Sequence, residues 1–169
     1  LSDYYKGELK TFDADLGKNV FRFHLHVTPD NDRCINFDRQ RNEIKTYNES
    51  PDNLLGVLGE TVEYKWQFKL DAGFQASSRF THIHQLKSVG ASNSEDDMPQ
   101  ITFTTRKGTG GNPDQLELRY AETLTQITWA QTDLTPFKGE WVEATETVTY
   151  GDWGEGTYAL EIKKVVDTG

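Results

Sequence analysis

Four histidines form two His-x-His pairs, and their type and spacing suggest chemistry most directly. The pairs are His24 with His26 and His82 with His84. Residues i and i+2 of a β-strand point to the same face, so each pair is expected to share one side of a sheet. Two imidazoles could supply two ligands of a zinc site. A further ligand would be needed, and the only thiol in the sequence is Cys34. We therefore predict no metal site; the imidazoles are either solvated polar groups or sugar-binding or catalytic ones.

A second pattern places charge at every other position of one segment, at Arg41, Glu43 and Lys45. One interpretation is an exposed strand with cross-strand ion pairs, which contribute little to stability. The other is a fixed lattice of polar groups in which Arg and Lys neutralise a bound carboxylate. Arg106 and Arg119 could add positive charge from neighbouring strands.

The charge of the whole chain limits the classes of partner. Its 169 residues include 27 acidic and 18 basic side chains, a net charge of −9. Nucleic acid is not expected as a partner, because binding phosphates requires basic surface. An anionic sugar polymer remains open, since a local basic groove can lie on an acidic body. No apolar run reaches the roughly 20 residues of a membrane helix, so no membrane partner is expected.

Two acidic loops raise the question of calcium, which prefers oxygen ligands. Neither loop has EF-hand spacing, so no cofactor is required and calcium is the one metal left open. The acidic residues are Asp30, Asp32 and Asp38 in one loop and Glu95, Asp96 and Asp97 in the other.

Two features favour secretion. The chain begins at Leu1, which is typical of a processed N-terminus, and Asn48-Glu49-Ser50 is a glycosylation acceptor pattern.

The elements that must position these residues are strands. Apolar and polar residues alternate with a period of two, most clearly over 60–70, and no segment shows helical spacing. This predicts a single all-β domain over 1–169, a two-sheet antiparallel β-sandwich of the jelly-roll, concanavalin-like kind. The other predicted strands cover 21–27, 39–47, 79–87, 101–106, 115–120, 122–129, 141–150 and 157–166.

The order and spacing of these segments resemble a jelly-roll polysaccharide lyase, most closely the fungal glucuronan lyase family with its alginate-lyase-like fold. The likeness covers roughly residues 20–166. Arg41-Asn42-Glu43-Ile44-Lys45 is similar to the Arg-x-Glu-x-Arg strand of those lyases, with Lys in the last position. His82-Ile83-His84 is similar to their Gln-x-His strand, with His in place of Gln; Gln85 could supply the amide.

The resemblance implies cleavage of a uronic-acid polymer of the glucuronan or alginate type by β-elimination. Donors neutralise the carboxylate beside C5, and a base removes the C5 proton. It implies His84 as the base and Arg41 and Gln85 as neutralisers. The residues expected to bind substrate are His82, Glu43, Lys45, Arg106 and Arg119.

One element of the family pattern, the strand with the catalytic tyrosine, would follow the segment from Glu161 to Asp167, and the sequence ends at Gly169. We therefore expect a sandwich that lacks its last one or two strands, with a second polypeptide completing the sheet. The alternative to a lyase is a non-catalytic carbohydrate-binding protein, a lectin, on the same fold, so the sequence leaves open whether the chain is an enzyme.

Overall fold

The computed structural model describes residues 10–25, 40–47, 49–89, 97–152 and 154–165. The chain divides into two compact units. One consists of Leu1–Val62, Thr149–Thr157 and Val166–Gly169, and the other of Glu63–Val148 and Tyr158–Val165. The single domain over 1–169 stays a prediction.

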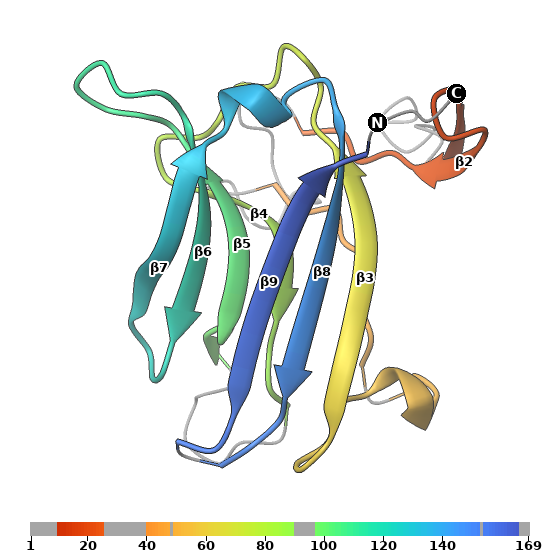
Figure 1. Ribbon diagram of the computed structural model, residues 1–169, viewed down its shortest axis with the longest axis vertical. Helices are drawn as coiled ribbons and strands as arrows, with labels where there is room; N and C mark the ends of the chain where they lie inside the picture. Colours follow the sequence, from red (N-terminus) through yellow and green to blue (C-terminus); the bar gives the residue numbers. More distant parts are fainter. Residues whose placement is uncertain (1–9, 26–39, 48, 90–96, 153, 166–169) are drawn as a thin grey trace. The chain divides into compact units, whose positions relative to one another are not determined.

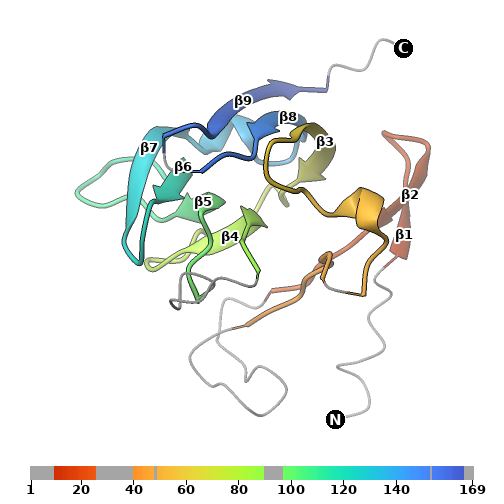
Figure 2. The same cartoon turned by 90° about the horizontal axis from the view of Figure 1, so that it is seen from below.

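The second unit contains two sheets, apart from four residues at strand ends, and the sheets face each other in Figure 2. The three-stranded sheet has the order β3 (Thr61–Lys69), β8 (Trp141–Thr149), β9 (Thr157–Lys164). The four-stranded sheet follows chain order, with β4 (Thr81–Leu86), β5 (Ile101–Arg106), β6 (Gln115–Ala121) and β7 (Gln126–Asp133) (Figure 1). The predicted all-β, antiparallel two-sheet sandwich is confirmed.

Alternation along the strands explains why the two sheets pack together. In β8, Val142, Ala144, Glu146 and Val148 are buried, while Glu143, Thr145 and Thr147, which alternate with them, are not. Phe103 of β5 and Leu116 of β6 belong to the core cluster, together with apolar side chains from β3 and β9. A period of two places all these apolar groups on one face of each strand, where burial removes them from water.

Most strand predictions in this unit agree with the structure, and one is displaced. The strand predicted over 122–129 is β7 at Gln126–Asp133, because residues 122–125 form the loop of a hairpin that pairs Ala121 with Gln126. Two short 3-10 helices are also present, η1 (Asp52–Leu54) and η3 (Thr135–Phe137). No helix among the described residues is long and apolar enough to cross a membrane.

The first unit differs more from expectation. Its hairpin pairs β1 (Lys10–Asp13) with β2 (Lys18–Phe21), and the sequence did not predict β1. Of the strand predicted over 21–27, residue 21 ends β2, residues 22–25 are not strand, and 26–27 lie outside the described residues. Residues 40–47 are not strand either, so the strand prediction over 39–47 is wrong there. That segment has no apolar face to bury: even Ile44 is 63% exposed.

Candidate functional site

The outer face of the four-stranded sheet carries a continuous set of polar side chains, which we call the polar face. Residues directly opposite each other in an antiparallel pair share a face, and the registers His82↔Thr104, Thr104↔Glu117 and Thr102↔Arg119 place these groups together. Phe103 lies between the two threonines and points the other way, into the core. The polar face consists of His82, Gln85, Thr102, Thr104, Arg106, Glu117, Arg119, Gln126 and Thr128.

A β-bulge in β4 decides which histidine lies on this face. The register shifts between His82, which pairs with Thr104, and His84, which pairs with Phe103. The extra residue, Ile83, packs against the core cluster. The prediction that His82 and His84 share a face is therefore wrong, because an inserted residue breaks the period of two. The same shift puts Gln85, opposite Thr102, on the polar face with His82.

The arginines of the polar face are held by one carboxylate. Glu117 is 5% exposed, and its Oε2 accepts from Arg119 Nη1 at 2.9 Å and from Arg106 Nε at 3.2 Å. Arg119 also donates to the Thr128 hydroxyl at 2.9 Å and to both oxygens of Gln126. This network fixes two positive charges on the sheet surface in one geometry.

His82 is the titratable group most strongly affected by the network. It is half-buried, its ring stacks on Phe80 with 4.5 Å between centroids, and its Nδ1 lies 2.8 Å from the Thr104 hydroxyl. Burial, followed by the charges of Arg119 and Arg106, lowers the pKa of His82 from 6.5 to about 4. The imidazole is therefore neutral at neutral pH and has a lone pair available for a proton.

The inner face holds a separate buried cluster around Glu146 of β8, which is 1% exposed. The Glu146 carboxylate accepts from Trp66 Nε1 at 2.5 Å and from the Tyr158 hydroxyl at 2.9 Å. Nδ1 of His84 lies 3.0 Å from Oε1 of Glu146, without an aligned hydrogen bond among the described residues. His84 also stacks on Trp66, with 4.8 Å between centroids.

Opposing effects set the pKa values in this cluster. Burial alone would raise the pKa of Glu146, but the contacts from His84, Trp66 and Tyr158 outweigh it, and the net pKa is lowered. Burial, together with the neighbouring Glu146 charge, raises the pKa of Tyr158. The cluster therefore favours the carboxylate form of Glu146 and the neutral phenol of Tyr158.

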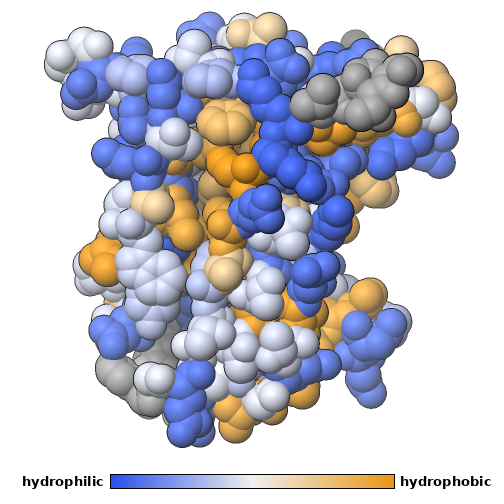
Figure 3. All heavy atoms as spheres, in the orientation of Figure 1, coloured by the Kyte–Doolittle hydropathy of each residue, from blue (hydrophilic) through white to orange (hydrophobic). Residues whose placement is uncertain are grey.

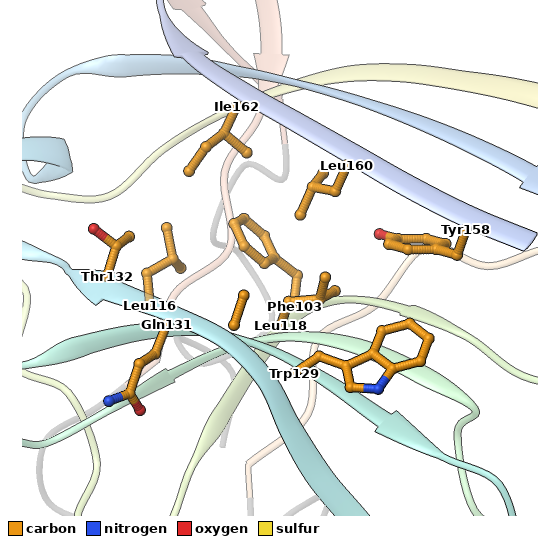
Figure 4. A pocket seen from close by; sticks show the side chains of 10 residues that line it. Phe103, Leu116, Leu118, Trp129, Gln131, Thr132, Tyr158, Leu160 and Ile162 are labelled. Atoms are coloured by element: carbon orange, nitrogen blue, oxygen red, sulfur yellow. The ribbon is translucent and has the colours of Figure 1, made fainter.

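An apolar groove opens between β9 on one side and β6 and β7 on the other (Figure 4). Both β9 and β7 are edge strands of their sheets. Phe103 and Leu116 form its floor, and Trp129, 49% exposed, lies at its rim. The Trp129 ring stacks on Tyr120 at 4.4 Å. Apolar surface is visible between these strands in Figure 3. A second polypeptide that completes the sheet stays a prediction.

The remaining predicted site residues lie in the first unit. Arg41, Glu43 and Lys45 are exposed, and Lys45 lies 3.8 Å from Glu43, as expected for alternate residues of an extended segment. The structure thus brings together four of the predicted residues, His82, Gln85, Arg106 and Arg119, on the polar face.

Within the described part of the chain, no group of three or more His, Cys, Asp or Glu side chains could hold a metal ion. Cys34, His26 and the predicted acidic loops, apart from Asp97, lie outside the described residues.

Sequence reasoning missed several members of both clusters, although signals for them exist. Thr102 and Thr104 alternate with Ile101 and Phe103, which marks them as one face of a strand. Glu146 occupies a position in β8 at which the alternation calls for an apolar residue. A charge at a core position is a signal that partners must be present.

Neither the family models, the curated proteins nor the solved structures contain a match to this chain. Its function is therefore inferred from the geometry of the polar face and from the residues themselves.

Proposed function

We propose that the protein is a polysaccharide lyase that cleaves a uronic-acid polymer of the glucuronan or alginate type by β-elimination on the polar face. The observation that carries the proposal is a neutral imidazole, His82, fixed beside an amide and two guanidinium groups on one sheet surface. A row of polar side chains across neighbouring strands suits an extended chain of sugars.

β-Elimination requires a base for the C5 proton and a means of stabilising the negative charge that develops. As the C4–C5 double bond forms and the C4–O bond breaks, the departing oxygen also needs a proton, which water can supply. The C5 proton becomes acidic enough to remove only when the neighbouring carboxylate is neutralised, and Arg119, Arg106 and Gln85 are the available donors. Arg charges contribute to the low pKa of His82. A bound uronate carboxylate would offset those charges and raise the basicity of His82 when substrate is present.

This proposal moves the role of base from one histidine to the other. The sequence favoured His84, whose Nδ1 lies against buried Glu146 on the inner face. His82 is on the same face as the arginines and Gln85. The base at His84 stays a prediction that can be compared directly with the base at His82.

The test is to incubate the protein with glucuronan and with alginate and to follow the ultraviolet absorbance of the unsaturated product. His82→Ala is expected to lower the rate by about 10²-fold or more, as for loss of a general base. Gln85→Ala should lower it less, and the exposed His24→Ala should retain it. Full activity of His82→Ala with loss in a folded His84→Ala variant would move the base back to His84.

A second candidate, a non-catalytic carbohydrate-binding protein, is favoured by one observation. The only tyrosine of β4–β7, Tyr120, lies on the inner face, opposite Ile101, so these strands offer no phenol on the polar face to protonate the leaving oxygen. Retarded migration of the protein in gels that contain glucuronan, without any growth of absorbance, would establish binding without cleavage.

A further inference from the structure

Two buried hydroxyl groups lie beneath His82 on the polar face. Thr102 and Thr104 have no exposed surface, and both belong to β5, directly opposite Gln85 and His82. The Thr104 hydroxyl donates to Oγ1 of Thr102 at 3.0 Å, and Nδ1 of His82 lies 2.8 Å from Oγ1 of Thr104. The imidazole is thus tied to the sheet through a short chain of hydroxyls.

The amide at the far end of this chain has a fixed orientation. Gln126 Nε2 lies 3.1 Å from the carbonyl oxygen of Pro99, which can only accept, and Gln126 Oε1 lies 3.4 Å from Arg119 Nε, which can only donate. Two independent contacts therefore agree on the orientation of the Gln126 amide. Its Nε2 also donates to the Thr102 hydroxyl, at 3.4 Å.

Counting protons assigns the histidine tautomer. A hydroxyl has one hydrogen, and that of Thr104 is directed to Thr102. Oγ1 of Thr104 is therefore an acceptor towards His82, whose Nδ1 must carry the hydrogen. In a neutral imidazole the other nitrogen, Nε2, then has the lone pair.

We propose that Thr104, held by Thr102, is a positioning residue that fixes His82 in the Nδ1–H tautomer and keeps Nε2 as its proton-accepting atom. The catalytic consequence rests on the proposed lyase function, but the tautomer does not. Thr104 acts only through His82 and does not contact substrate.

The test uses the intact chain labelled with nitrogen-15. Two-bond proton–nitrogen correlation spectra at neutral pH distinguish the two tautomers of each histidine, and His82→Ala identifies the His82 signals. Wild-type His82 is expected in the Nδ1–H form. Thr104→Val, which has nearly the same shape but no hydroxyl, should shift His82 towards Nε2–H, and Thr104→Ser should restore Nδ1–H.

Thr105 provides a matched control on the same strand. It is also fully buried, and its hydroxyl has no hydrogen-bond partner among the residues that the structure describes, so Thr105→Val should leave the His82 signals unchanged. Wild-type His82 in the Nε2–H form, or an unchanged Nδ1–H form in Thr104→Val, would overturn the proposal. If Thr104→Val fails to fold, the wild-type and Thr104→Ser spectra still decide the tautomer.

Kinetics separate this inference from the proposed function. If the protein cleaves glucuronan, Thr104→Val should lower kcat by ~10-fold or more with little change in KM, since it misplaces a proton at the base without removing a substrate contact. If no cleavage occurs, the lyase proposal fails while the spectra still confirm or refute the tautomer.

Discussion

At the scale of single residues, Glu146 of the second unit needs the support of its neighbours, because its carboxylate is buried. A carboxylate with 1% exposure is destabilising unless hydrogen bonds and opposite charge replace its water shell. Trp66, Tyr158 and His84 supply those interactions from β3, β9 and β4. One side chain of β8 therefore connects strands of both sheets.

We predict that Glu146→Gln lowers the free energy of unfolding by roughly 1–3 kcal/mol, as for buried donors left without their acceptor. The amide that replaces the carboxylate has no charge, and its NH₂ group would face side chains that are themselves hydrogen-bond donors. Urea unfolding at neutral pH measures the change. Glu143→Gln, on the exposed side of β8 between Lys65 and Lys163, is the control and should cost much less; equal losses would contradict the role of burial.

A second prediction concerns pH and His82. Its pKa is about 4 in the folded protein and near 6.5 when unfolded. Between these values only the unfolded chain binds the proton, so this residue makes stability fall as pH decreases from 6.5 towards 4 and adds no slope above 6.5. His82→Gln should flatten urea-unfolding midpoints between pH 6.5 and about 5, above the carboxylate range. His24→Gln should keep the wild-type profile; a wild-type slope in His82→Gln would refute this assignment.

At the scale of elements, the bulge in β4 has the largest consequence for function. A regular strand would place His82 and His84 on one face, as the sequence indicated. Ile83 faces the core, as it would in a regular strand, but the extra residue turns His84 to the core side as well, so the two histidines take opposite faces of the sheet. One imidazole joins the polar face and the other joins the buried carboxylate.

The loop between β5 and β6 provides an element-scale prediction. A Cβ at Gly108 would lie 2.0 Å from the backbone oxygen of Asn112 and 2.4 Å from that of Pro113, so Gly108→Ala must displace the loop. Gly110 has a φ of +62° with open space around it, and Gly110→Ala should cost only about 1 kcal/mol of strain. Thermal unfolding of both variants should show the larger loss for Gly108→Ala; the reverse order would contradict this loop geometry.

At the scale of the whole molecule, stability of the second unit depends on the layer between its sheets. Leu116 is 1% exposed and packs with Phe103 and Leu134. Leu116→Ala should lower the free energy of unfolding by about 2–5 kcal/mol, the range for a cavity in a packed core. Leu124→Ala, in the loop between β6 and β7 and 54% exposed, is the matched control and should be nearly neutral. Denaturant unfolding of the two variants makes the comparison.

The sequence by itself determined the all-β class and most strand positions, because a period of two and the excess of aromatic and β-branched residues are local properties. It also identified polar residues that the sheet brings together, among them Arg106 and Arg119. The strand prediction over 39–47 was wrong for residues 40–47. Alternating residue types are not enough to form a strand, because a strand also needs a neighbouring strand to pair with and an apolar face to bury.

Only the tertiary structure decided what the two central histidines do. Which face a side chain occupies depends on strand register, and register depends on pairing with residues distant in sequence, here Thr104 and Phe103. The bulge that separates His82 from His84 places both Ile83 and His84 on the core side, where His84 pairs with Phe103. The partners Thr104 and Glu146 were invisible to local patterns for the same reason: their roles arise from contacts across strands and between sheets.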